Sequence, residues 1–260
     1  DMDRLLAERD QFQPVTTPEL FARLWFGSMP GLISGQSPDR NIFYSSYLST
    51  YVERDVRELS GSVDALKFNR FVTAVAARCS QLLNYKALAD DADIDMPTAK
   101  NWVNILETLG IIFLLHPYSN NVLKRTIKTP KVYFYDTGLV CYLTRWSSPE
   151  VAESGAMSGA LLENFTVSEI MKSYQNAGLE PYLYFYRDRD AKEIDVILEG
   201  DGKLCPLEIK KTATPDKRLT RVFSVMDRSP LQLGTGAVLC MAEQFGAFDR
   251  DNLIVPIWMI

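Results

Sequence analysis

Residues 193–212 predict a β-hairpin, and this hairpin constrains the fold more than any other stretch of the chain. Two runs rich in β-forming residues flank Asp201-Gly202, a dipeptide that favours the two-residue turn whose twist suits paired strands. With these two residues as the turn, Gly200 pairs with Lys203. That pair sets the register of every pair farther from the turn, because a short turn leaves no slack between the strands.

The register brings three charged side chains onto one face of the hairpin. Counting outward from the turn places Asp195 opposite Glu208. Side chains alternate along a strand, so Glu208 and Lys210 project together, while Leu207 and Ile209 face the other way into a core. The sequence therefore predicts a sheet face that presents an aspartate, a glutamate and a lysine.

The two carboxylates of this face form a candidate metal site. Carboxylates held this close repel each other unless a proton or a cation lies between them. Mg²⁺ is the expected ion because it takes oxygen ligands and keeps some of its waters. Lys210 beside them is able to orient or deprotonate one such water and to steady a phosphate oxygen. The alternative is a solvated sheet face with ordinary mixed charges, since so short a pattern also arises by chance.

An aspartate followed by Glu-x-Lys on the next strand resembles the catalytic motif, written PD-(D/E)xK, of the restriction-endonuclease-like superfamily. The matching residues here are Asp195, Glu208 and Lys210. The resemblance implies a magnesium-dependent nuclease, with Mn²⁺ as a substitute ion.

Composition and charge limit the class of protein. With 260 residues, 47% of them hydrophobic and 23% charged, the chain has the composition of a folded protein of one large or two modest domains. The formal charge of −5, from 28 basic and 33 acidic residues, argues against a protein that coats nucleic acid through bulk charge. Any contact with nucleic acid must therefore be local.

Several kinds of site are excluded by the residues present. His116 is the only histidine, which excludes polyhistidine metal sites, and its position at the end of the apolar run 111–115 favours a structural role over a catalytic one. The four cysteines are far apart and predict neither a zinc site nor a disulfide framework. The sequence has no Gly-x-x-x-x-Gly-Lys-Ser/Thr phosphate loop, so this chain should not hydrolyse nucleotide. It also lacks a membrane-spanning apolar run and a signal peptide, so we expect a cytoplasmic protein without membrane contact.

The first part of the chain predicts helices followed by a β-ribbon. Thr17 is the expected N-cap of a helix that Gly27 ends. Further helices are expected at residues 1–12, 38–59, 68–83, 85–91, 96–109 and 136–143, with strands at 111–115 and 131–135. The three helices between 68 and 109, followed by the two strands, are typical of a winged helix-turn-helix.

A winged helix would present two sets of residues to nucleic acid. The outward residues of its third helix are Thr98, Lys100, Asn101 and Asn104, and the ribbon region adds the cations Lys124, Arg125, Lys128 and Lys131. Such cations would bind DNA phosphates with an affinity that falls steeply as salt rises. The alternative is a winged helix that contacts protein, with the cations only solvating a loop.

The rest of the chain predicts the order helix, three strands, helix, strand. The helices are expected at residues 159–174 and 215–226, and the strands at 181–186, in the hairpin, and at 236–241 and 253–258. This order is the core of the endonuclease-like fold, in which an acidic residue of the first helix leans over the hairpin. Glu163 is the expected residue, and Glu169 is the weaker candidate. The expected class is α+β, with a winged helix at 61–146 and an endonuclease-like domain at 147–260.

The chain also resembles a bacterial and archaeal family of unknown function that lies C-terminal to an AAA-type P-loop ATPase module. The resemblance rests on strings within residues 51–56, 124–139, 159–165, 184–188, 193–195 and 207–210. It implies that Glu163, Asp195, Glu208 and Lys210 are the site residues. It also implies that residues 1–60 are a helical linker or the tail of an ATPase module that this chain does not include.

Two functions follow as hypotheses. In the first, the chain is a Mg²⁺-dependent phosphodiesterase acting on DNA, governed by the ATPase module. Asp195, Glu208 and the carbonyl of Ile209 would then hold the metal, and Glu163 would complete its shell or bind a second ion. In the second, the chain is a catalytically inactive DNA- or protein-binding adaptor for the ATPase. The oligomeric state stays open.

Overall fold

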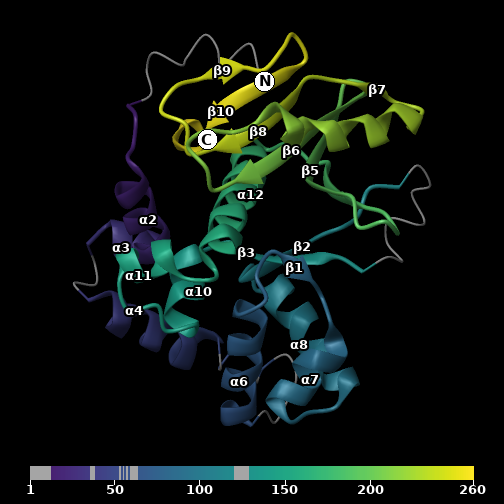
Figure 1. The fold of residues 1–260 in the computed structure, drawn as a ribbon. Coiled ribbons are helices and arrows are strands. Elements are labelled where there is room, and N and C mark those ends of the chain that lie inside the picture. Colours follow the sequence, from purple (N-terminus) through teal and green to yellow (C-terminus); the bar gives the residue numbers. More distant parts are fainter. Residues whose placement is uncertain are drawn as a thin grey trace. The chain divides into compact units, whose positions relative to one another are not determined.

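The computed structural model describes residues 13–35, 39–52, 54, 56, 58, 64–119 and 129–260, and Figure 1 traces their elements along the chain. The chain divides into two compact units. Unit 1 comprises residues 1–20, 115–129 and 166–260, and unit 2 comprises residues 21–114 and 130–165. Helices combined with a mixed multi-stranded sheet confirm the expected α+β class.

The first described helix, α2 (Thr17–Phe26), begins with a capping box. The hydroxyl of Thr16 accepts a hydrogen bond from the Glu19 N–H at 3.4 Å, and the Glu19 carboxylate accepts one from the Thr16 N–H at 2.8 Å. The N-cap is therefore Thr16, one residue before the prediction. Gly27, with a φ of 96°, follows the helix as expected.

The helix expected at residues 38–59 is only partly regular. It begins as α4 (Arg40–Ser46) after Asp39, whose side chain accepts a hydrogen bond from Ile42 N. It continues as the π-helix η2 (Tyr47–Val52), and a short helix, α3 (Pro30–Ile33), precedes it. The helix expected at residues 1–12 lies outside the described residues.

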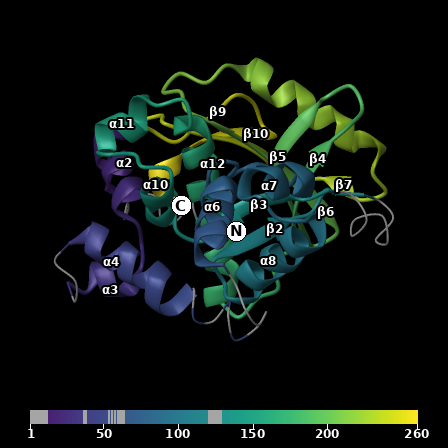
Figure 2. The same cartoon turned by 90° about the horizontal axis from the view of Figure 1, so that it is seen from below.

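Unit 2 also contains a small sheet and a group of three helices, and Figure 2 shows the three helices near one another. The helices are α6 (Ala65–Ala76), α7 (Tyr85–Ala92) and α8 (Met96–Thr108), and the strands are β1 (Gln81–Leu82), β2 (Ile112–Leu115) and β3 (Lys131–Phe134), in the order β1-β3-β2. The edges of Phe68 and Phe71 pack against Trp102 at centroid distances of 5.2 and 5.3 Å. The helix expected to reach residue 83 ends at 76, because Ser80 takes a left-handed φ of 63° and the chain then forms β1.

A buried carboxylate joins the N-terminal helices of unit 2 to α10 (Thr137–Leu143). Asp136 caps α10 by accepting a hydrogen bond from Leu139 N at 2.6 Å. It also accepts hydrogen bonds from Ser28 N and from the hydroxyl of Tyr44, each at 2.6 Å. Arg40 donates to the carbonyl of Gly138 at 2.8 Å. Helices α11 (Pro149–Ser154) and α12 (Ser158–Asn176) follow along the chain.

Unit 1 is built on a mixed sheet with the strand order β4-β5-β6-β8-β10-β9, with β7 pairing beside β6. Strand β5 pairs antiparallel with both β4 and β6, whereas β6, β8 and β10 run parallel to one another. The bounds are β4 (Leu183–Arg187), β5 (Glu193–Gly200), β6 (Lys203–Lys210), β7 (Gln232–Leu233), β8 (Gly236–Cys240), β9 (Gly246–Ala247) and β10 (Asn252–Pro256), with η4 (Ile257–Met259) at the end.

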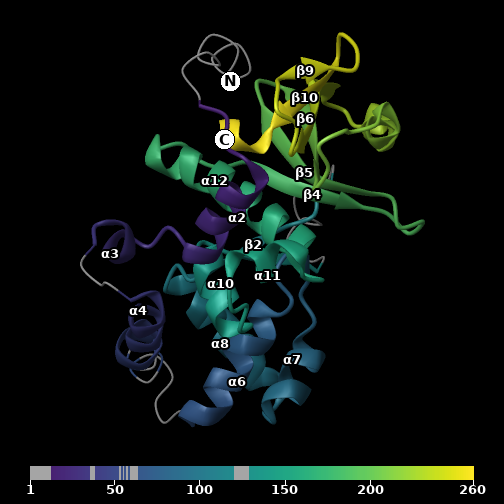
Figure 3. The same ribbon diagram turned by 60° about the vertical axis from the view of Figure 1, so that its left-hand side comes forward.

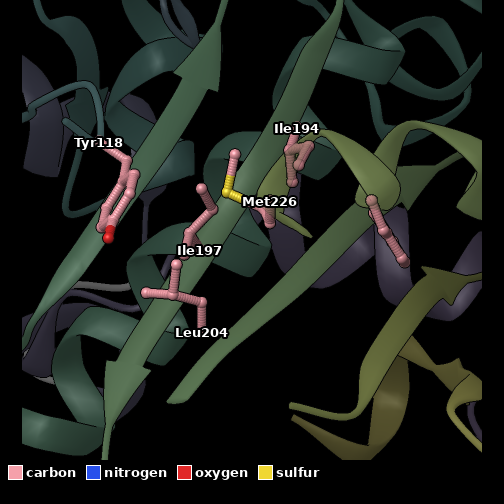
Figure 4. Packing of buried hydrophobic residues seen from close by; sticks show 6 residues of the cluster. Tyr118, Ile194, Ile197, Leu204 and Met226 are labelled. Carbon is pink, nitrogen blue, oxygen red and sulfur yellow. The ribbon is translucent and has the colours of Figure 1, made fainter. Parts of the chain in front are cut away.

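One face of this sheet is covered by the 3₁₀-helix η3 (Lys217–Arg228), where the sequence predicts a helix at residues 215–226. Met226 packs in a buried cluster with Ile197 and Leu204, as Figure 4 shows. Phe223 of the same cluster lies so close to Gly236 that a Cβ there would be 2.8 Å from its ring. The second half of α12 lies across the sheet from η3 (Figure 3). Within the described residues, no helix is both long and apolar enough to cross a bilayer.

Candidate active site

The hairpin forms with the predicted register. Pairs run from Gly200–Lys203 at the turn to Val196–Leu207. The turn residues Asp201 and Gly202 have φ values of 50° and 71°, the left-handed geometry of a type I′ turn. The next residues outward on the two strands are Asp195 and Glu208, as the sequence predicts.

Asp195 lies on β5, one residue beyond Val196–Leu207, the last pair of β5 with β6. The pairing of β5 with β4 shifts here, since Tyr184 pairs with Ile197 but Tyr186 pairs with Ile194. Such a shift is a β-bulge, which redirects the side chains beside it. The Asp195 Oδ2 atom accepts a hydrogen bond of 2.8 Å from the backbone N–H of Ile209. This bond holds the carboxylate against β6.

The structure brings Asp195, Glu208 and Lys210 together. Lys210 Nζ lies 2.6 Å from Glu208 Oε1 and 3.4 Å from Asp195 Oδ2. The two acidic residues are only 6% and 8% exposed, whereas the lysine side chain is 40% exposed. The cluster therefore has two buried carboxylates and one cation that reaches solvent.

The protonation state of Lys210 determines whether it acts as a hydrogen-bond donor or as a base. Burial lowers the pKa of Lys210, but the charges of Asp195 and Glu208 and their hydrogen bonds raise it, and the net shift is upward. Lys210 is therefore an ammonium group at neutral pH. It can donate hydrogen bonds to a water or a phosphate oxygen. Because it already carries its proton, its other expected role, removing a proton from a water, is disfavoured.

The cluster fits a hard divalent cation. Two carboxylates and one ammonium group leave one net negative charge in a largely buried place. Mg²⁺ typically binds one or two carboxylates and fills its other positions with waters and substrate phosphates. The part of the chain that the structure describes has no group of three or more His, Cys, Asp or Glu residues able to hold a metal. The fit thus rests on Asp195 and Glu208, and the role of the Ile209 carbonyl stays a prediction.

Glu163, the acidic residue expected to lean over the hairpin, belongs to unit 2. Its Oε1 atom pairs with Lys131 Nζ at 3.0 Å and accepts a hydrogen bond from the Tyr133 hydroxyl at 2.7 Å. Its expected role as a metal ligand stays a prediction. Glu169, the weaker candidate, forms an ion pair with Lys172 on the next turn of α12.

The residues expected to bind nucleic acid differ in their exposure to solvent. The Lys131 side chain is 3% exposed and paired with Glu163, and its expected contact with phosphate stays a prediction. On α8, Lys100, Asn101 and Asn104 are exposed and Thr98 is half-buried. The other expected cations, Lys124, Arg125 and Lys128, lie outside the described residues.

Acidic residues surround the start of α8. Asp90, Asp91, Asp93 and Asp95 are all exposed. Hydrogen bonds from the hydroxyl and the N–H of Thr98 lower the pKa of Asp95, so this carboxyl group is ionised at neutral pH. These charges oppose the approach of a phosphate backbone to the exposed face of α8.

A basic segment that follows the hairpin is not among the residues predicted above to bind nucleic acid. Between residues 210 and 228 the chain has six lysines and arginines but only two aspartates. Charge counted in a sliding window would have found it. The apolar spacing of the helix predicts its buried face but carries no information about the charge of its exposed face.

The fold and the cluster define a class: an α+β protein with a helical unit and a mixed-sheet unit that carries an Asp-Glu-Lys cluster. Comparison with protein families agrees with this two-part organisation. Residues 17–150, about half of the chain, match the family described as "Domain of unknown function (DUF8612)", and the chain belongs to this family. Residues 158–260 match a second family model, "Domain of unknown function (DUF4143)".

Two curated mycobacterial proteins are similar to this chain. They are "Uncharacterized protein Mb2031c" of Mycobacterium bovis and "Uncharacterized protein Rv2008c" of Mycobacterium tuberculosis, each 29% identical over 238 residues. The alignments cover 90% of this chain and 52% of each relative. The chain therefore spans about half the length of these relatives. No solved structure matches it.

Proposed function

We propose that unit 1 is a Mg²⁺-dependent phosphodiesterase that acts on DNA. The observation that carries this proposal is the cluster of Asp195, Glu208 and Lys210, in which one solvent-reaching cation lies between two buried carboxylates. The cluster lies at the carboxyl end of β6, which runs parallel to β8. Open sheets with parallel strands bind their ligands at this end.

Each residue of the cluster would have a distinct part in the reaction. Asp195 and Glu208 would hold the ion, which when bound lowers the pKa of a water and offsets charge developing on the phosphate. The Ile209 N–H fixes the orientation of the Asp195 carboxylate before any ligand arrives. Lys210 would move from the carboxylates to a phosphate oxygen, since its side chain is 40% exposed.

The arrangement of elements supports the endonuclease-like and winged-helix parts of the proposal. Along the chain, helix α12, three antiparallel strands, the helix η3 and the parallel strand β8 follow each other in the expected order. In unit 2, three helices and a small sheet of order β1-β3-β2 support a winged helix that positions the substrate. We also propose that an AAA-type ATPase module works with this chain. The mycobacterial relatives, about twice as long as the aligned region, have room for one.

A cleavage assay tests the proposal. Purified protein is incubated with plasmid and single-stranded DNA while Mg²⁺ or Mn²⁺ is titrated. Wild type is expected to cleave only with a divalent ion, and Lys210→Ala is expected to lose at least about 100-fold in rate, the scale of one electrostatic catalytic group. Lys203→Ala, an exposed lysine on the same strand, is the matched control and should cleave normally. Full activity in Lys210→Ala would overturn the assignment.

A second function is favoured by one feature of the same cluster. Lys210 already bridges the two carboxylates, which neutralises part of their charge without a metal. The alternative is therefore an inactive DNA- or protein-binding adaptor for the ATPase module. Salt-dependent DNA binding with no cleavage under any divalent ion would favour the adaptor over the nuclease.

A further inference from the structure

The charge of the chain is unevenly distributed. The whole sequence carries −5, yet residues 210–228 include Lys210, Lys211, Lys217, Arg218, Arg221 and Arg228 against Asp216 and Asp227. A basic segment inside an acidic protein is a local electrostatic feature that bulk composition hides. Most of this segment is η3.

Helix η3 begins beside the candidate active site. Leu219, in its first turn, packs against the buried cluster that includes Val238 and Cys240 of β8. These two residues pair in register with Glu208 and Lys210 of β6. Neighbouring residues in register point to the same side of a sheet. The start of η3 therefore lies on the same sheet face as the cluster, one strand away from it.

The buried and exposed sides of η3 differ sharply in character. Phe223 and Met226 are buried on the sheet, while Lys217, Arg218, Arg221 and Arg228 are exposed. The buried side fixes the helix in place, so the cations are presented on a rigid element.

The exposed cations of η3 fall into two sets. Lys217 pairs with Asp249 at 2.8 Å, and Arg218 pairs with Asp216 at 2.9 Å. Arg221 and Arg228, by contrast, form no ion pair within the described part of the chain, although the charge of Arg221 contributes to lowering the pKa of Asp216. A guanidinium group without a direct ion pair is well suited to bind a phosphate with two hydrogen bonds.

We propose that the exposed face of η3, through Arg221 and Arg228, binds the phosphate backbone of a nucleic acid beside the Asp195–Glu208 cluster. A 3₁₀-helix of 12 residues is roughly 24 Å long, which suits a chain of phosphates better than a single phosphate. The acidic surroundings of α8 make that helix the weaker contact. The location of the substrate rests on the proposed function, but the binding itself does not require cleavage.

Binding is measured by fluorescence anisotropy in EDTA, with labelled duplex DNA, single-stranded DNA and RNA of one sequence. The double variant Arg221→Gln/Arg228→Gln is expected to bind at least tenfold more weakly, and its salt slope should fall by about two, one for each lost phosphate contact. Arg23→Gln/Lys203→Gln removes the same charge from exposed positions elsewhere and should stay within about twofold of wild type. Lys100→Ala tests the contact through α8.

The outcomes separate the two proposals. Wild type that binds none of the three nucleic acids, or a double variant that binds as tightly as wild type, overturns the role of η3. An equal loss in the control variant does the same, because the effect would then be net charge alone. Loss of binding in Arg221→Gln/Arg228→Gln together with loss of cleavage in Lys210→Ala supports both proposals. Wild type that binds through η3 but never cleaves overturns only the nuclease. The three probes show which backbone is preferred.

Discussion

Lys210 neutralises part of the charge of two buried carboxylates, and the stability of the site depends on it. Asp195 also accepts the Ile209 N–H, so its position is fixed by the backbone as well as by charge. Glu208 lies 2.6 Å from Lys210 Nζ. Removing the ammonium group would leave two neighbouring carboxylates in a poorly solvated place.

Lys210→Met is therefore expected to lower the free energy of unfolding at pH 7 by about 1–3 kcal/mol. This is below the usual cost of breaking a buried ion pair, because the lysine side chain is 40% exposed and partly screened by solvent. Urea denaturation measures the loss, with Lys203→Met as the control. Mg²⁺ should stabilise Lys210→Met more than wild type, since the variant has the more negative site. Equal stability of Lys210→Met and wild type would contradict this account.

The pKa of Lys210 predicts an alkaline dependence. Its pKa in the folded protein is raised above the ordinary value of 10.5. Its stabilising contribution is thus complete below pH 10.5 and is lost as the pH rises through the folded-state pKa. The difference in melting temperature between wild type and Lys210→Met should stay constant from pH 8 to about 10 and narrow above it. A difference that already shrinks near neutral pH would show that another group is responsible.

At the scale of elements, the hairpin turn sets the site. The type I′ turn requires a positive φ at both of its central residues, and Asp201 and Gly202 have it. Gly200, one residue before the turn, lies in the strand and pairs with Lys203. A Cβ at either glycine would meet nothing within 4 Å, so the two positions differ in backbone conformation and not in space.

Gly202→Ala should therefore destabilise the protein by about 1–2 kcal/mol, the cost of placing an L-residue in the left-handed region. Gly200→Ala, with the same added methyl group, should be neutral or slightly stabilising. Thermal melts of the two variants check the contrast. Similar losses in both would mean that packing around the tip, and not the turn, limits stability.

Elements with local signals could be predicted, and those without them could not. The hairpin register and the helix starts after Asp39 and Asp136 follow from turn and capping chemistry within a few residues. Strand β1 was missed because its two residues, Gln81 and Leu82, carry no periodicity and pair only with β3. The π-helical form of η2 and the 3₁₀ form of η3 likewise have no local signal.

At the scale of the whole molecule, the chain has two compact units with separate polar networks. In unit 2, burial and the charge of Asp136 raise the pKa of Tyr44, so the hydroxyl keeps its proton and donates it to that carboxylate. In unit 1, the comparable network is formed by Lys210 with its two carboxylates. Within the described contacts, these networks share no residue.

Tyr44→Phe should lower the free energy of unfolding by about 1–3 kcal/mol, because the buried Asp136 loses a hydrogen-bond donor. Combined with Lys210→Met, the two losses should add to within about 0.5 kcal/mol. A double-mutant cycle by urea denaturation measures the sum. A coupling energy above about 1 kcal/mol would show that the two networks depend on each other.

By itself the sequence determined the hairpin, its register and the three charged residues on one face, because strand alternation and a two-residue turn act over short distances. Only the tertiary structure decided which charges meet. It paired Lys131 with Glu163, placed Lys210 between Asp195 and Glu208, and set the basic face of η3 beside that cluster. Lys131 and Glu163 lie 32 residues apart in the chain, so their pairing depends on packing, which no local pattern encodes.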